Sequence, residues 1–298
     1  MVDHSADHIT TEEAAQLIET LRGRLEGDGV RFHPGVSYRH LTIVDGEAFA
    51  QTRCTPPHDI LGQPIAGHLP GGPGAERLRQ LMEASVAVLR DHPVNRARRQ
   101  AGKRPANMLW FWGQGTAVAF PAFQSLYGRR GACISAVDIV RGIARLAGME
   151  VLQVPGITGY FDTNYRGKAE HALRALEEGR DLVVIHVEST DEAGHMGDAA
   201  KKVQAIEDVD RQVVGPVLEG LRRGGGPFAV LVTPDHPTST AARTHIAEPV
   251  PFALYATDGP RDGAPAYSEP AVRNAGTRFE QGFELMGFFL SPGRTNAS

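Results

Sequence analysis

The stretch from Asp181 to Val250 decides the fold of this chain. It begins DLVVIHVESTDEAGHMGD (181–198) and, after a helical segment, continues FAVLVTPDHPTSTAARTHIAEPVPF (228–252). LVVIHV and FAVLV are short apolar runs rich in Val, which is typical of buried strands in a parallel sheet. Polar side chains follow the end of each run, and open α/β sheets bind their ligands at the carboxyl ends of their strands. The stretch therefore predicts an α/β protein with a ligand site at one sheet edge.

Imidazole and carboxylate groups gather directly after these two strands. Five side chains of metal-ligating type lie there, namely Asp191, His195, Asp235, His236 and His245. Asp191 and His195 have D-x-x-x-H spacing, and we expect Gly194 to let the backbone turn between them. Mixed nitrogen and oxygen ligands suit Zn, Mn, Co or Fe. A single His is more often a surface or core residue than a ligand, but a set of five at successive strand ends predicts a metal centre.

The five side chains divide into two sets. Asp191, His195 and His245 would give a first ion three protein ligands and an open position, which is the pattern of a catalytic metal site. Asp235 and His236 would give a second ion only two ligands, so another group must complete that site. Two divalent ions about 3.5–4 Å apart can hold both oxygens of a phosphoryl group during its displacement.

Composition limits the class of protein. The chain has 298 residues, 41% of them hydrophobic and 22% charged, with a net charge of −4. One large domain or two smaller ones fit this length, and no basic excess indicates nucleic acid or a membrane surface as a partner. Cys54 and Cys133 do not make a disulfide framework. Neither an apolar leader nor a run of ~18 apolar residues is present, so we predict a cytoplasmic protein.

The patterns before residue 128 predict a mixed unit of helices and strands. Thr10 and Glu13 form a T-x-x-E capping box, which predicts a helix over 11–25. A second helix is expected from Gly74 to Leu89, and alternating residues predict strands over 36–44 and 48–54. The basic segment 91–104 is either a solvated loop or a site that attracts a small dianion.

Two residues of this first part could contact a substrate. Arg39 is either a solvent-facing residue of an edge strand or a ligand of an anion, to which a guanidinium binds through its planar fork. His58 follows two prolines in a long loop rich in Pro and Gly, and long loops are often functional.

Regular alternation of strands and helices begins after Gly128. This order of elements predicts parallel β-α-β units and a domain boundary at this glycine. A helix expected over 199–221 should bury Val203 and Ile206 and bend at Pro216.

The motifs also resemble those of a known family. TDEAGH, TPDH and THIAEPVP, in that order, are similar to the metal motifs of the alkaline-phosphatase superfamily. More narrowly, they resemble the archaeal-type cofactor-independent (2,3-bisphosphoglycerate-independent) phosphoglycerate mutases. The similarity continues through PGVSYRHL, TPPHDI, PANMLWFWGQG, GACISAVDIVRGIARLAG and VPGITGYFDTNYRGKA. It implies a mainly parallel sheet with flanking helices and an inserted smaller α+β domain. Residues 1–128 would be that inserted substrate domain, and 129–298 the C-terminal part of the metal-binding domain.

A reaction follows from the resemblance. It implies interconversion of 3-phosphoglycerate and 2-phosphoglycerate, a step of glycolysis and gluconeogenesis, through a phosphoserine intermediate and with two divalent ions (Mn, Co, Zn or Mg). The five side chains above are the metal ligands that it implies. Residues in matching segments that could hold the substrate are Arg39, His58, Arg96 and Lys168.

The resemblance also predicts what this chain does not contain. The family's N-terminal segment, with a further metal-ligating Asp and the serine nucleophile, has no counterpart here, so the inserted domain is expected to be N-terminally incomplete. Ser135, Ser189 and Ser239 have the contexts of cap or turn residues. We therefore expect the chain alone to be inactive or nearly so, and to form a homo-oligomer or require a complementing N-terminal segment.

Two alternatives stay open. One is a mutase-like enzyme for another small phosphate or phosphonate acid, which activity against such acids would reveal. The other is a non-catalytic subunit that binds metal and anions.

Overall fold

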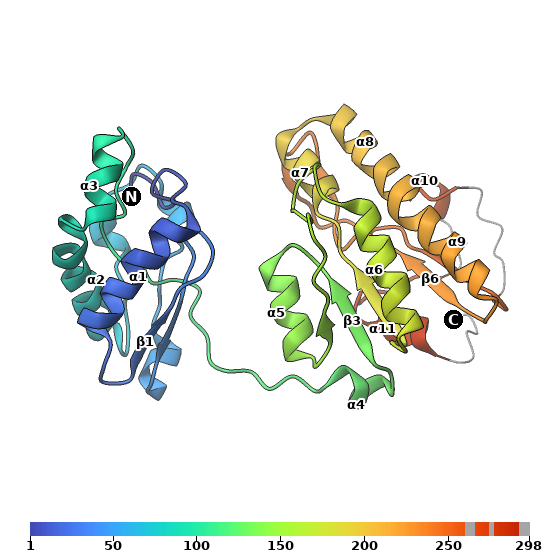
Figure 1. Ribbon diagram of the computed structural model, residues 1–298, viewed down its shortest axis with the longest axis horizontal. Helices are drawn as coiled ribbons and strands as arrows, with labels where there is room; N and C mark the ends of the chain where they lie inside the picture. The colour runs from blue at the N-terminus through green and yellow to red at the C-terminus, as the bar shows by residue number, and fades with distance from the viewer. Residues whose placement is uncertain (260–265, 274–276, 292–298) are drawn as a thin grey trace. The chain divides into compact units, whose positions relative to one another are not determined.

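The computed structural model describes residues 1–259, 266–273 and 277–291. The chain forms two compact units, Met1–Val118 and Ala119–Ser298 (Figure 1). This division falls before Gly128, where the sequence placed its boundary. The reason is helix α4 (Phe123–Tyr127), which ends at Gly128 but packs in the second unit, where Phe123 contacts the cluster of Leu182 and Phe289. Within the described residues, no helix is both long and apolar enough to cross a bilayer.

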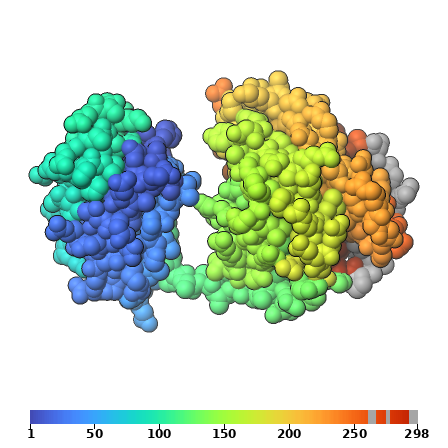
Figure 2. All heavy atoms as spheres, in the orientation of Figure 1, coloured from blue at the N-terminus to red at the C-terminus, as the bar shows by residue number. Residues whose placement is uncertain are grey.

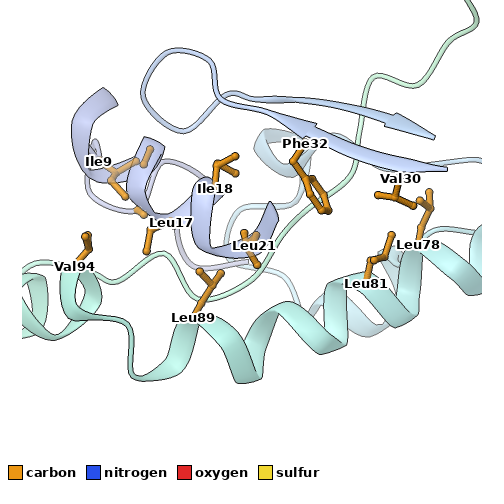
Figure 3. Packing of buried hydrophobic residues seen from close by; sticks show 12 residues of the cluster. Ile9, Leu17, Ile18, Leu21, Val30, Phe32, Leu78, Leu81, Leu89 and Val94 are labelled. Carbon is orange, nitrogen blue, oxygen red and sulfur yellow. The ribbon is translucent and has the colours of Figure 1, made fainter. Parts of the chain in front are cut away.

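Helices α1 (Thr11–Leu25) and α2 (Ala75–Arg90) enclose the core of the first unit with the antiparallel strands β1 (Val30–His33) and β2 (Leu41–Val44). The predicted capping box is confirmed, because Thr10 Oγ1 accepts from Glu13 N and Glu13 Oε2 accepts from Thr10 N, at 3.2 and 3.1 Å. Figure 3 shows the core side chains that these elements bury, which include Leu17, Ile18, Leu21, Val30, Phe32, Leu78, Leu81 and Leu89.

Two predicted strands of the first unit, and the loop predicted for its basic segment, were wrong. The strand expected over 36–44 is confined to β2, so Arg39 precedes it in a loop. The segment expected as a strand over 48–54 forms the 3-10 helix η1 (Glu47–Gln51). Much of the basic segment is a helix, α3 (Pro93–Gln100), and its Arg98 is buried. Two more 3-10 turns, η2 (Pro57–Ile60) and η3 (Ile65–His68), follow one another in the Pro-rich loop.

A parallel sheet organises the second unit. Strand β3 (Gly131–Ile134) is its centre and pairs in parallel with β4 (Glu150–Val151) and β5 (Leu182–Ile185). Helices α5 (Asp138–Leu146) and α6 (Tyr165–Glu177) alternate with these strands. The predicted α/β fold with a parallel sheet and flanking helices is therefore confirmed.

The FAVLV run does not join that sheet as a buried parallel strand. It forms β6 (Ala229–Val232), which pairs antiparallel with β9 (Ala253–Ala256) and is only partly buried. Its apolar character comes from one packed face, where Leu231 and Leu254 lie against the cluster around Phe123. A short antiparallel pair, β7 (Thr238–Ser239) and β8 (Thr244–His245), follows β6.

The helix expected over 199–221 is divided. Helix α8 (Ala199–Val209) continues through a π-helical turn (Asp210–Val214) into α9 (Gly215–Gly224). Pro216 lacks an N–H, so one i→i−4 hydrogen bond of the helical ladder is lost just after the π-helical turn. The expected burial was wrong, because Val203 and Ile206 are 56% and 51% exposed. The π-helical turn and α9 pack against α6, and Figure 2 shows their orange atoms beside the yellow-green atoms of α6. The last described helices are α10 (Glu269–Val272) and α11 (Glu284–Leu290).

Helix α5 exposes an apolar stripe on the second unit. Ile139, Ile143 and Leu146, at positions i, i+4 and i+7, are 70%, 50% and 55% exposed. Contiguous apolar surface of this kind is typical of interaction sites. We expect Ile143→Lys to lower both the binding of an apolar fluorescent dye and the light scattering of concentrated protein. Arg145→Lys, on an exposed position of the same helix, should change neither, and a lysine variant that binds as much dye as the wild type would refute this expectation.

Candidate metal centre

Helix α7 (Ser189–Met196) carries the first two candidate ligands. Asp191 and His195 lie at i and i+4, so the helix presents both on one face. Gly194 is therefore not a turn residue, as the sequence suggested, but a buried position inside the helix. A Cβ there would lie 2.6 Å from Thr238 O, so glycine permits the close approach of α7 to β7. The turn itself comes at Gly197, whose φ is 71°.

Asp191, His195 and His245 converge on one point. Asp191 Oδ2 lies 3.2 Å from His195 Nε2, Asp191 Oδ1 lies 3.2 Å from His245 Nε2, and the two Nε2 atoms are 3.1 Å apart. Two ligand atoms on a tetrahedral ion with bonds of about 2.0–2.2 Å are separated by roughly 3.3–3.6 Å. The donor chemistry and these separations fit a divalent cation.

His236 joins the same group. Asp191, His236 and His245 each offer one donor atom, and these atoms all lie within 4.8 Å of one another. The His236 and His245 rings are 3.8 Å apart between centroids. Asp235 is adjacent, with Oδ2 3.5 Å from His236 Nε2. The division into two separate ligand sets is therefore not visible in these distances, because His236 lies near Asp235 and also near Asp191 and His245 of the first set.

Thr238 was not singled out in the sequence. Its buried hydroxyl donates to Asp191 Oδ1 and lies 3.2 Å from His236 Nδ1. Lys202 Nζ donates to the Thr238 carbonyl, which holds β7 against α8. The one sequence signal for Thr238 is its position two residues after His236, because on a β-strand that spacing places two side chains on the same face.

A second polar network lies at the ends of β3 and β5. Ser135 Oγ is 3.2 Å from His186 Nδ1, and His186 Nε2 is 3.2 Å from Glu188 Oε2. Burial, and then the negative charges of Asp191 and Asp235, raise the pKa of Glu188. Burial lowers the pKa of His186. This excess of carboxylates near the candidate ligands favours a bound cation, and the sequence did not predict the part of Glu188.

Lys168 is buried in this network rather than presented on the surface. Its side chain is 1% exposed, and Nζ donates to His186 O at 2.7 Å. Burial lowers its pKa to about 8, against a weaker opposing effect of Glu188.

The pH dependence of stability should report this burial. Between pH 8 and about 10.4 the unfolded chain holds the Lys168 proton more tightly than the folded protein. The unfolding free energy of the wild type should therefore rise with pH in this window relative to that of Lys168→Met, since deprotonation removes the cost of the buried charge. Urea unfolding followed by circular dichroism measures both. A difference that is flat across the window would contradict the prediction.

The other predicted substrate residues lie in the first unit. Arg39, His58 and Arg96 are all exposed. A chain of side-chain contacts connects Arg39 to His58. The Arg39 guanidinium lies over the Tyr38 ring at 5.4 Å, and the His4 ring contacts both Tyr38 and His58 edge to face. The His58 ring also contacts Trp112, at 5.4 Å. Lys168 belongs to the second unit, and the binding of one substrate by it together with Arg39 and His58 stays a prediction.

The hydroxyls of the three serines considered in the sequence analysis all form hydrogen bonds with nearby groups. Ser135 Oγ accepts from Val137 N at 3.0 Å, and Ser239 Oγ accepts from Ala242 N at 3.1 Å, as in turns. Ser189 is fully buried and bonded to Tyr165 Oη at 2.7 Å.

Comparisons with known proteins cover nearly the whole chain. The family model of the Metalloenzyme superfamily matches residues 7–276. The 2,3-bisphosphoglycerate-independent phosphoglycerate mutase of Methanosarcina mazei is 48% identical over 289 residues, which are 97% of this chain and 72% of that protein. A probable enzyme of the same name from Geobacter sulfurreducens is 48% identical over 291 residues, again 97% of this chain and 72% of that protein.

Solved structures show the same similarity. The cofactor-independent phosphoglycerate mutase of Thermoplasma acidophilum is 26% identical, with a TM-score of 0.61 over 93% of this chain and 68% of that one. A protein of Pyrococcus horikoshii, 24% identical, shares the fold with a TM-score of 0.73 over 92% of this chain and 70% of that one.

Proposed function

This chain belongs to the family of 2,3-bisphosphoglycerate-independent phosphoglycerate mutases, and we propose that it serves the interconversion of 3-phosphoglycerate and 2-phosphoglycerate. The observation that carries the proposal is the 48% identity to a named mutase over 97% of this chain. The convergence of Asp191, His195 and His245 supports it, because a metalloenzyme of this superfamily requires a divalent-metal site.

We assign the metal centre as follows. Asp191, His195 and His245 would hold one divalent ion, and Asp235 and His236 would contribute to a second. Ions bound there would supply electrostatic stabilisation to the oxygens of a transferring phosphoryl group. Membership of the Metalloenzyme superfamily supports metal binding in general, whereas the number of ions and their identity are part of the proposal.

The protein's own groups would bind and orient the substrate. A phosphoglycerate carries a carboxylate and a phosphate, and Arg39 can bind either through two parallel hydrogen bonds. His58 lies in the same chain of side-chain contacts, with the rings of His4 and Tyr38 between it and Arg39. Arg96 and Lys168 remain proposed substrate residues. For Lys168 the bond to His186 O supports an indirect part, in which it orients the end of β5.

We do not assign the phosphorylated serine to Ser135, Ser189 or Ser239. Each hydroxyl is engaged with a neighbouring group, and Ser135 and Ser189 are 1% and 0% exposed. Incubation of the protein with 3-phosphoglycerate and Mn²⁺, followed by mass spectrometry, should find none of these three phosphorylated. A phosphate on any of them would show that this assignment is wrong.

Two measurements test the proposal. Phosphorus NMR follows the formation of 2-phosphoglycerate by the Mn²⁺-loaded protein, with a small phosphono acid as the competing substrate. Calorimetry measures binding of 3-phosphoglycerate by the wild type and by Arg39→Ala. The matched control is Arg31→Ala, an exposed arginine of the same unit that pairs with Asp45 at 2.7 Å.

Each outcome separates the alternatives. We expect Arg39→Ala to bind more weakly and Arg31→Ala to bind as the wild type does. Equal affinity in all three proteins would remove Arg39 from the site. Turnover of the phosphono acid alone would favour the related-enzyme alternative, and binding without turnover would favour a chain that acts only with another segment or subunit.

A further inference from the structure

Thr238 lies between two members of the candidate metal centre. Its hydroxyl donates to Asp191 Oδ1 and is 3.2 Å from His236 Nδ1. The residue is 4% exposed. In the β7–β8 pair it is directly opposite His245, a third member of the centre.

A count of protons decides the direction of these bonds. A threonine hydroxyl has one proton to donate, and an ionised carboxylate can only accept. Because the Thr238 proton is given to Asp191, the hydroxyl can only accept at its other contact. His236 must then carry its proton on Nδ1, which leaves the lone pair of the neutral imidazole on Nε2.

The surroundings of Nε2 agree with this assignment. The nearest carboxylate oxygen, Asp235 Oδ2, lies 3.5 Å away. The Asp235 carboxylate has no proton to donate. Asp235 Oδ2 and His236 Nε2 therefore face each other with free lone pairs, at the separation expected for two ligands of one cation.

We propose that Thr238 is a positioning residue that holds His236 in the Nδ1–H tautomer and so presents Nε2 to a divalent cation. The inference rests on the proposed metal function and adds to it a residue outside the ligand set. Such outer partners fix the tautomer and ring orientation of metal-binding histidines, and their loss typically costs 10–100-fold in metal affinity.

The position of Thr238 is itself rigid. Lys202 Nζ bonds to its carbonyl, and the space on the α7 side is closed, since a Cβ on Gly194 would lie 2.7 Å from Thr238 Cγ2. Small movements of the hydroxyl relative to Asp191 and His236 are therefore restricted.

Calorimetry with Mn²⁺ alone is the first test. Thr238→Val keeps the shape but removes the hydroxyl, and we expect it to bind Mn²⁺ 10–100-fold more weakly than the wild type. Thr238→Ser restores the hydroxyl and should recover most of the affinity. The matched control is Thr163→Val, because Thr163 is 5% exposed and its hydroxyl accepts from a backbone N–H, that of Thr158.

The second test needs no variant. In metal-free wild type at a pH where His236 is neutral, proton–nitrogen correlation NMR of ¹⁵N-histidine-labelled protein should show the proton on Nδ1. A proton on Nε2 would overturn the inference, as would a folded Thr238→Val protein with wild-type affinity. If the valine variant does not fold, the NMR result decides. Failure of the wild type to bind Mn²⁺ would instead refute the proposed metal centre, and the tautomer would still be measured.

Discussion

His245→Ala is expected to abolish tight metal binding. His245 Nε2 lies 3.2 Å from Asp191 Oδ1 and 3.1 Å from His195 Nε2, so its removal takes away the atom on which the other two converge. Loss of an outer partner costs up to about 100-fold in affinity, and loss of a direct ligand should cost more. Mn²⁺ calorimetry measures the change in affinity.

The metal-free protein should be almost unaffected by the same change. The His245 side chain is 52% exposed, and surface substitutions usually alter the unfolding free energy by less than about 0.5 kcal/mol. His171→Ala is the matched control, because His171 bonds to Gly167 O of its own helix and lies outside the proposed centre. We expect it to bind Mn²⁺ as the wild type does. Unchanged Mn²⁺ stoichiometry and affinity in His245→Ala would remove this histidine from the centre.

Arg98→Ala should produce the largest loss of stability in the first unit. The Arg98 side chain is 1% exposed, and its Nη1 donates to Glu13 Oε2 at 2.5 Å. Its other nitrogens donate to the carbonyls of Ala6 and Arg104. Removing one partner of a buried ion pair costs roughly 3–5 kcal/mol, and we expect the lower end because Glu13 remains 29% exposed.

Tryptophan fluorescence isolates this effect. Both tryptophans of the chain, Trp110 and Trp112, belong to the first unit, so their fluorescence in urea follows that unit alone. Arg99→Ala is the control, because Arg99 is the exposed neighbour with one bond, to Arg90 O at 2.9 Å. It should shift the unfolding free energy by less than about 0.5 kcal/mol. Equal unfolding midpoints for the two variants would show that the buried arginine is not structurally important.

Local features could be predicted from the sequence. The helix Thr11–Leu25 was predicted at its observed bounds, because a capping box is formed by residues three apart and needs no distant partner. The ligand types and their order could also be predicted, because residue type and spacing along the chain need no tertiary contact. Their assignment as ligands remains a prediction, although the structure brings Asp191, His195 and His245 together.

The sequence by itself thus determined the α/β fold class, the family and the residue types of the centre. The tertiary structure alone decided which groups meet. Three features depend on segments far apart in the chain. They are the antiparallel pairing of β6, the closeness of His236 to Asp191 and His245, and the close approach of Gly194 to Thr238. Arg98 shows the reason most clearly. From sequence alone a basic side chain is expected to be exposed to solvent. The acceptor that allows Arg98 to be buried, Glu13, is 85 residues away in the chain. Burial of a polar group is stable only where such distant partners satisfy it.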